Sequence, residues 1–337
     1  MLKGAVLLDF TYICNDSHDP RYNLALEETL FQEAVAKRCG FLMLWVNNPV
    51  VVVGRYQNTA EEVNKDFTEQ NHVHVVRRMT GGGAVYHDRG NLNYTVIMPS
   101  DDAAVLDIQA FGIPLLDCLQ SLGVTAERTG RNDVTVQSQK ISGVAQYSSN
   151  GIVLHHGTIL YDSSLQDVAK ALNVSPEKYR SKGFKSVRSR VTNLRGHLAQ
   201  DMSLMQFQKY FEKVLVDFYH AASVRPPSEA EHSRALELAR EKYGSWDWVW
   251  GQSPAFTAVQ SRRFAGGTVT VGLVVEKGLI RECRIFGDFF SLKGVDQLQS
   301  YMEGRQYPFA DSIDDLLITE SFTGVPPEEF RQFLREL

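Results

Sequence analysis

Hydrophobic positions in the first half of the chain follow two periods, one helical and one extended. Between Asn23 and Lys37 the apolar residues Leu26, Leu30 and Ala34 recur every four positions, which places them on one stripe and predicts a helix. Short runs rich in β-branched and aromatic residues predict strands. These runs are residues 4–10, 41–46, 50–53, 73–77, 84–87, 92–98, 124–128, 134–136, 140–146 and 152–161.

Further helical patterns separate these strands unevenly. They cover residues 61–70, 107–122, 165–172, 203–221 and 229–243, with Asp107 as the N-cap of the second. A parallel sheet requires strands and helices to alternate regularly, and this chain does not show that alternation. The predicted fold class is therefore α+β, with a mixed, largely antiparallel sheet.

The character of the sequence changes after residue 245. The aromatic segment Trp246-Asp247-Trp248-Val249-Trp250 precedes three predicted strands, at 256–261, 268–275 and 279–286, and helices near 295–303 and 326–335. A chain of 337 residues is long for one hydrophobic core and suits two domains. We predict a first domain of residues 1–245 and a small α+β domain of residues 246–337.

Composition narrows the class of protein. Hydrophobic residues make up 43% and charged residues 22%, which is typical of a soluble globular protein, and a net charge of -5 argues against nucleic-acid binding. No apolar run approaches the roughly 20 residues of a membrane span, and residues 1–10 do not resemble a signal peptide. The four cysteines lie far apart without a CxxC pair, so we expect a protein of the reducing cytoplasm.

The segment Arg77-Arg78-Met79-Thr80-Gly81-Gly82-Gly83 lies between two predicted strands. Consecutive glycines leave backbone N–H groups open to a ligand, and the two arginines can neutralise phosphate oxygens. The alternative is a plain hairpin with two surface arginines, because short glycine motifs are weak evidence. The segment lacks the Gly-Lys-Ser/Thr of a P-loop.

A second segment combines Gly130-Arg131-Asn132-Asp133 with Lys140-Ile141-Ser142-Gly143. Asn132 and Asp133 favour a turn, and Asp133 is also a candidate ligand for Mg²⁺ on a triphosphate. Lys140 begins an otherwise apolar strand. Its side chain either points to solvent, the ordinary place for lysine, or reaches into a pocket.

Histidines occur in two suggestive pairs. His155 and His156 are adjacent in a predicted strand, so their side chains point to opposite faces and cannot hold one metal ion together. His72 and His74 share a face, but no third ligand has suitable spacing. The sequence therefore gives little support for a histidine metal site.

Residues 178–194 carry many basic side chains and no acidic one, within an acidic protein. One interpretation is a solvated surface loop. The other is a flap that closes over an anionic ligand, with Gly183 as its hinge.

These segments together resemble the lipoate–protein ligases, in the long bacterial form that has an accessory C-terminal domain. The matching segments stand in the family's order and span most of the chain. They are RRMTGGGAVYHD (77–88), GRND (130–133), KISG (140–143), HHGT (155–158), KSVRSRVTNL (185–194) and WDWVWGQSPAF (246–256).

The resemblance implies a catalytic domain of the biotin/lipoate protein ligase fold with a set of ligand-binding residues. It implies that Lys140 is the catalytic residue and contacts both the adenylate and the lipoyl carbonyl. The residues implied to bind ATP or the adenylate are also Arg78, Gly83, Ala84, Val85, Tyr86, Asn132 and Asp133. Those implied to bind lipoate are also Gly81, Gly82, Gly83, Gly143 and His156. The implied flap residues are Lys185, Arg188 and Arg190.

The resemblance also implies an activity and its partners. The enzyme would activate lipoate with ATP and Mg²⁺ to lipoyl-AMP and pyrophosphate, then transfer the lipoyl group to a lysine. Implied acceptors are the lipoyl domains of 2-oxoacid dehydrogenase E2 subunits and the glycine-cleavage H protein. A slot for lipoate's apolar chain is expected among Val51–Val53, Val76 and Val144.

Three alternatives remain open. A biotin ligase has several arginines among the glycines of its phosphate loop, and this loop has none after Arg78. An amidotransferase of the same fold needs a reactive thiol beside the lysine, and no cysteine lies in these motifs. The third alternative is a non-catalytic module that binds lipoyl-AMP or lipoyl domains.

Overall fold

The computed structural model describes residues 9–100, 110–130, 132–173, 190–251, 256, 258–307 and 313–336. The chain divides into two compact units. The first comprises Met1–Val52, Val63–Val76 and Val85–Ser245. The second combines Trp246–Leu337 with two earlier segments, Val53–Glu62 and Arg77–Ala84. The glycine-rich segment therefore belongs to the second unit.

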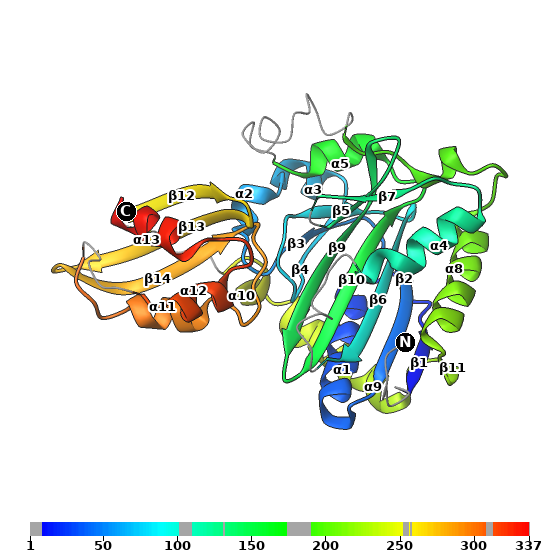
Figure 1. The fold of residues 1–337 in the computed structure, drawn as a ribbon, viewed down its shortest axis with the longest axis horizontal. Coiled ribbons are helices and arrows are strands. Elements are labelled where there is room, and N and C mark those ends of the chain that lie inside the picture. The colour runs from blue at the N-terminus through cyan, green and yellow to red at the C-terminus, as the bar shows by residue number, and fades with distance from the viewer. Residues whose placement is uncertain are drawn as a thin grey trace. The chain divides into compact units, whose positions relative to one another are not determined.

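An eight-stranded sheet forms the centre of the first unit (Figure 1). Strand β1 is parallel to both of its neighbours, and every other neighbouring pair is antiparallel, which confirms the predicted α+β class with a largely antiparallel sheet. The strands in spatial order are β11 (Ser223–Arg225), β1 (Phe10–Cys14), β2 (Gly40–Val46), β6 (Asn91–Pro99), β10 (Ile152–Leu160), β9 (Gln139–Ser149), β8 (Asp133–Val136) and β7 (Glu127–Thr129).

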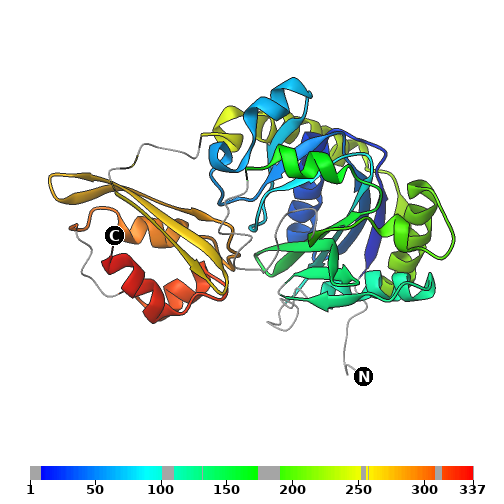
Figure 2. The same ribbon diagram turned by 90° about the horizontal axis from the view of Figure 1, so that it is seen from above.

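Helices cover both faces of this sheet (Figures 1 and 2). Helices α4 (Ile113–Ser121) and α8 (Leu204–Tyr219) pack on one face, where Leu115, Phe207 and Phe211 are fully buried with the strand residues. The opposite face carries α1 (Pro20–Lys37) and, packed on it, α9 (Glu229–Leu238), which continues into a π-helical turn at Ala239–Tyr243.

The small elements before residue 174 differ in part from the prediction. The helix predicted over 61–70 is interrupted, because Val63 forms a bridge with Leu172 and Asn64 caps a new helix by accepting from the Phe67 N–H at 3.1 Å. The remaining elements are α2 (Thr59–Glu62), α3 (Lys65–Gln70), α5 (Leu165–Ala171) and a three-stranded sheet of β4 (His74–Arg77), β3 (Val50–Val53) and β5 (Val85–His87).

The start of the chain and the region of Asp107 also differ. The first described strand begins at Phe10, whereas a strand was expected over residues 4–10; residues 1–8 lie outside the described part. Asp107 also lies outside it, and the helix expected from there is described from a 3-10 turn at Ala110–Gly112 onwards.

The second unit contains the three strands and the two helices predicted after residue 245, and its described residues there form two further short helices. Its sheet has the order β12 (Ala258–Phe264), β13 (Gly267–Glu276), β14 (Leu279–Gly287). Helices α11 (Asp296–Met302), α12 (Asp315–Ser321) and α13 (Pro327–Arg335) bury one face of it around residues such as Val271, Ile285 and Phe330, and α10 (Trp246–Val249) precedes them. Helices α10 and α12 were not predicted.

Among the described residues, no helix has both the length and the apolar character that a membrane crossing requires.

Candidate active site

The Lys140 side chain lies across the sheet and does not extend into solvent. Its Nζ is 2.6 Å from Asp133 Oδ1, and the two side chains are 21% and 18% exposed. Gly143 makes room for it, because a Cβ there would lie 2.5 Å from the Lys140 Nζ. A register irregularity between β8 and β9 sets Lys140 opposite Thr135 and Gly143 opposite Asp133. The solvent-facing alternative for Lys140 is therefore wrong.

The C-terminal end of the predicted flap joins the sheet at Lys140. Arg190 Nη2 lies 2.9 Å from Asp133 Oδ2, so the Asp133 carboxylate is shared by two cations. Val191 forms a parallel bridge with Lys140, and the Thr192 N–H donates to the Lys140 carbonyl at 3.0 Å. Of the predicted flap residues Arg190 is described, while Lys185 and Arg188 lie outside the described residues.

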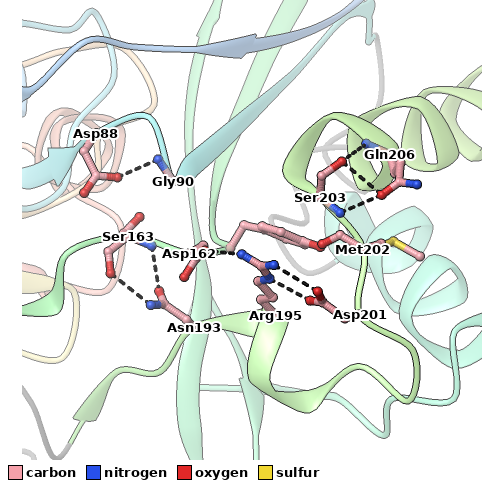
Figure 3. Close-up of polar contacts among 11 residues, drawn as sticks. Asp88, Gly90, Asp162, Ser163, Asn193, Arg195, Asp201, Met202, Ser203 and Gln206 are labelled. Atoms are coloured by element: carbon pink, nitrogen blue, oxygen red, sulfur yellow. Dashed lines mark hydrogen bonds and ion pairs between the residues drawn. The ribbon is translucent and has the colours of Figure 1, made fainter.

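Polar contacts hold the next stretch of chain in place (Figure 3). Asn193 exchanges two hydrogen bonds with the Ser163 backbone, at 3.1 and 2.9 Å. Arg195 bridges Asp162 and Asp201, each at 2.7 Å. The position of Arg190 beside Asp133 is thus supported by a fixed segment a few residues further on.

His156 lies on the same face of the sheet as Lys140. It pairs with Ala145 on β9, two residues from Gly143, and side chains alternate along a strand. Its Nδ1 is 3.0 Å from both carboxylate oxygens of Glu27, a residue of α1 that is only 2% exposed. Thr95 donates to the same carboxylate at 2.7 Å.

His155 points to the opposite face, as predicted, where its ring stacks on Phe111 with 4.9 Å between ring centroids. Val144 also packs in the core of that opposite face, so it does not line the face that carries Lys140. Among the described residues, no group of three or more His, Cys, Asp or Glu side chains is arranged to hold a metal ion.

The glycine-rich segment forms a tight loop within the second unit. Gly82 has φ +90°, a conformation that favours glycine, and its N–H donates to the Phe289 carbonyl at 3.0 Å. A Cβ on Gly81 would meet that same carbonyl at 2.5 Å. At Gly83, by contrast, no described atom lies within 4 Å of where a Cβ would be. Packing therefore requires the first two glycines and leaves the third open.

Arg78 folds this loop around its own guanidinium. Its Nε donates to Thr80 Oγ1 at 2.8 Å, and its Nη2 donates to the carbonyls of Gly81 and Gly83 at 2.6 and 2.9 Å. The side chain is 5% exposed. Arg78 thus binds the loop's carbonyl oxygens, which differs from the surface position assumed by the plain-hairpin alternative.

Asn132 joins the two strands beside Lys140. Its side-chain amide donates to the Val144 carbonyl at 2.8 Å, and its own carbonyl accepts from the Val144 N–H at 2.9 Å. The structure therefore places Asn132, Asp133, Lys140, Gly143 and His156 on one sheet of the first unit, and Arg78 and Gly81–Gly83 in one loop of the second.

The sequence did not single out Glu27 or Thr95. Glu27 looked like a polar position of an amphipathic helix, and only the packing of α1 on the sheet brings it to His156, 129 residues away. A buried carboxylate in a helix has no local signature that separates it from a solvated one.

The cysteines offer no activated thiol. Burial raises the pKa of Cys118 and of Cys283 to about 12, and it also raises the pKa values of Cys14 and Cys39. A nucleophilic thiol requires a lowered pKa, so these side chains do not suit a cysteine amidotransferase.

The first unit thus carries a paired, partly buried lysine on a mixed sheet, and the second unit carries a glycine loop folded around an arginine. Two family models match the chain: the lipoyl protein ligase A/B catalytic domain over residues 19–216, and the bacterial lipoate protein ligase C-terminus over residues 253–334. The chain belongs to the lipoate–protein ligase family.

Individual relatives agree with this assignment. Lipoate-protein ligase LplJ of Bacillus subtilis is 37% identical over 93% of this chain and 96% of its own length. A bi-partite lipoate protein ligase of Thermoplasma acidophilum, from a structural analysis of that ligase and its E2 lipoyl domain, is 28% identical with a TM-score of 0.65, covering 75% of this chain and 100% of that one. A lipoate-protein ligase A bound with ATP is 26% identical with a TM-score of 0.62, covering 72% and 99%.

Proposed function

We propose that this enzyme activates lipoate with ATP and transfers the lipoyl group to a lysine of an acceptor protein. In the first step a lipoate carboxylate oxygen attacks the α-phosphorus of ATP, and pyrophosphate leaves. In the second step the acceptor's amine attacks the lipoyl carbonyl, and AMP leaves. Both steps develop negative charge on oxygens around the same acyl-phosphate group.

The confined position of Lys140 is the observation that carries this proposal. Its ammonium is held at 2.6 Å by Asp133 and lies over Gly143, where no side chain interferes. A fixed cation stabilises developing charge better than a mobile surface lysine, because the site does not reorganise during the reaction. Lys140 would bind the bridging oxygens of the acyl-phosphate in both steps.

The glycine loop supplies a second binding element. Since Arg78 holds the carbonyls of Gly81 and Gly83, the loop's oxygens turn inward toward the guanidinium. The open space at Gly83 lets a phosphate approach the backbone closely, and main-chain N–H groups in such loops bind anions. We assign Gly83, Ala84, Val85 and Tyr86 to the adenylate on this basis.

Magnesium would enter as the MgATP complex. Asp133 is the carboxylate that we expect beside the phosphates, and its oxygens face Lys140 and Arg190. Carboxylate oxygens and substrate phosphates are the usual ligands of Mg²⁺. Asp133 would therefore be the residue that holds Mg²⁺ beside the phosphates, next to Lys140 and Arg190.

The acceptors that we propose are lipoyl domains of 2-oxoacid dehydrogenase E2 subunits and the glycine-cleavage H protein. The Thermoplasma acidophilum ligase is described, in a structural analysis of a lipoylation system, alongside its E2 lipoyl domain, which supports the first of these. All four cysteines are free thiols, which agrees with an enzyme that functions in the reducing cytoplasm.

Intact-mass spectrometry of a purified lipoyl domain tests the transfer. With enzyme, lipoate and MgATP, the domain should gain one lipoyl group, and a domain with its acceptor lysine changed to arginine should gain none. Omitting ATP or chelating Mg²⁺ with EDTA should abolish the gain. Modification without ATP, or an unmodified domain under the full conditions, would contradict the proposal.

A further inference from the structure

Arg77, the residue before Arg78, is buried, and among the described residues it has no counter-ion. Its side chain is 1% exposed, and within the described part of the chain no carboxylate pairs with it. Burial, and after it the charge of Arg55, lower the pKa of Arg77 to about 10. A buried cation is costly unless other groups satisfy its donors, and a buried arginine cannot neutralise a ligand's phosphate from the surface.

Main-chain oxygens satisfy this guanidinium. Nη1 donates to the carbonyls of Gly54, Arg55 and Gln57 at 2.9, 2.9 and 2.7 Å. Nε donates to the Trp248 carbonyl at 2.8 Å, and Nη2 donates to Thr59 Oγ1 at 2.7 Å and to the Val249 carbonyl at 3.1 Å. One planar fork thus binds two segments of chain that are remote from each other in sequence.

Trp248 in turn binds the backbone of Arg77. The indole N–H of Trp248 donates to the Arg77 carbonyl at 2.8 Å. Thr59 Oγ1 donates to the Val249 carbonyl at 2.5 Å. Arg77, residues 54–59 and residues 248–249 therefore form one hydrogen-bonded cluster, all within the second unit.

This cluster stands directly against the glycine loop. A Cβ on Gly54 would lie 2.0 Å from the Gly82 carbonyl oxygen, so these two backbones touch. The Arg55 N–H donates to the Thr80 carbonyl at 2.9 Å, and the Arg78 N–H donates to the Val53 carbonyl at 3.0 Å. Displacing residues 54–57 would therefore displace the loop.

We infer that Arg77 is a positioning residue for acyl activation, which holds the glycine loop in its binding shape and makes that shape depend on Trp248 and Val249. It contacts no substrate and acts through Gly54, Arg55 and the loop. The inference rests on the proposed function. It separates the roles of the two adjacent arginines: Arg78 folds the loop from inside, and Arg77 fixes the support behind it.

The decisive variant is Arg77→Lys, which keeps the charge but loses the planar fork of donors. We expect the KM for lipoate in pyrophosphate exchange to rise about tenfold or more, because a loop that is no longer preorganised must be ordered by the ligand. The Kd of a non-hydrolysable lipoyl-adenylate analogue should rise in parallel. Arg262→Lys, in β12 of the same unit, is the matched control and should leave both constants near wild type.

Loss of folded protein is distinguishable from this effect. Partial unfolding lowers the active fraction, so it would reduce kcat and leave KM unchanged. If Arg77→Lys does not fold, Trp248→Phe is the second variant, because it removes the indole N–H that donates to the Arg77 carbonyl and keeps a smaller aromatic ring. We expect it to raise KM several-fold.

Two results would overturn the inference. One is a folded Arg77→Lys enzyme with wild-type KM and Kd, and the other, if Arg77→Lys does not fold, is an unchanged KM in Trp248→Phe. In either case wild-type exchange in the same assay shows that the proposed function stands. Absence of lipoate-dependent exchange in the wild-type enzyme would instead refute the proposed function itself.

Discussion

At the scale of single residues, we propose that the reaction depends on two glycines that leave space beside the backbone. Gly143 lets Lys140 lie across the sheet toward Asp133, and Gly83 leaves its own loop open. The other two loop glycines serve packing, since Gly81 and Gly82 fit against the Phe289 carbonyl. The space at Gly143 is therefore filled by the Lys140 ammonium, and we propose that the space at Gly83 receives a phosphate.

Replacing Lys140 tests the first of these features. Lys140→Ala should lower the rate of adenylate formation by about two to three orders of magnitude, the effect expected when charge stabilisation of a reacting group is lost. The measurement is single-turnover formation of lipoyl-AMP. Lys170→Ala, on the exposed side of α5, is the control. Near-normal activity of Lys140→Ala would remove Lys140 from the mechanism.

Replacing Gly83 tests the second feature. Gly83→Ala should fold with unchanged thermal stability, because no described atom lies near its Cβ, yet the KM for ATP should rise about tenfold or more as the methyl group occupies the ligand's space. Gly196→Ala, at a similarly open glycine, should change neither quantity. Unaltered kinetics in Gly83→Ala would mean that no substrate approaches this backbone.

Most of the candidate residues could be predicted from the sequence, but their surroundings could not. Short motifs identified Lys140, Asp133, Arg78 and the glycines. The buried guanidinium of Arg77 looked like a second phosphate ligand, because burial depends on Trp248 and Val249, more than 170 residues later. Local sequence carries no information about such a contact.

At the scale of elements, an ion pair between a partly exposed arginine and a buried glutamate joins an edge strand to a helix. Arg225, at the end of β11, donates to both carboxylate oxygens of Glu231 at 2.7 Å. Glu231 also accepts from the Ser228 N–H, which completes a capping box at the start of α9. The edge of the sheet and the helix that covers α1 are thereby fixed together.

Lowering the pH should break the ion pair between Arg225 and Glu231. Burial by itself raises the pKa of Glu231, but the hydrogen bonds from Arg225 and Ser228 outweigh it and lower the pKa from 4.5 to about 2. Because the folded pKa lies below the unfolded one, the stabilisation is complete above about pH 4.5 and is lost as pH falls toward about 2.

The corresponding variant is Glu231→Gln. Its melting temperature should fall at pH 7 by roughly 2–4 °C for each kcal/mol lost, and the difference from wild type should shrink as pH drops from 4.5 to 2. Glu229→Gln, in the exposed first turn of the same helix, serves as the control. If the difference in melting temperature between Glu231→Gln and wild type stays constant as the pH falls from 4.5 to 2, the carboxylate charge contributes nothing to stability.

The periodicity of the sequence predicted most elements and missed features that arise from tertiary contacts. Long, strongly patterned elements such as α8 and β10 were predicted within a few residues. The parallel pairing of β1 with β2 and β11 was not predicted, because pattern specifies which face of a strand is buried and not which strand lies beside it.

At the scale of the whole molecule, the second unit includes two pieces of the N-terminal half. The glycine loop packs with Phe289, Phe290 and Trp248, all of which come after residue 245. A polypeptide of residues 1–245 would therefore keep Lys140, Asp133 and Arg190 and lose the packing of its glycine loop.

We predict that this truncated protein does not activate free lipoate and still transfers from supplied lipoyl-AMP, because the Lys140 cluster lies within residues 1–245. Adding residues 246–337 as a separate polypeptide should restore some activation. Circular dichroism checks that the truncated protein is folded. Activation of lipoate at the full rate by residues 1–245 alone would show that the rest of the chain is dispensable.

The central claim is that this chain makes an acyl-adenylate from lipoate. The most direct test is lipoate-dependent exchange of radiolabelled pyrophosphate into ATP by the purified full-length enzyme, with biotin in a parallel reaction. We predict exchange that requires lipoate and Mg²⁺ and is absent with biotin. No exchange would indicate an amidotransferase or a binding module, and exchange with biotin in place of lipoate would indicate a biotin ligase; either result would contradict the account.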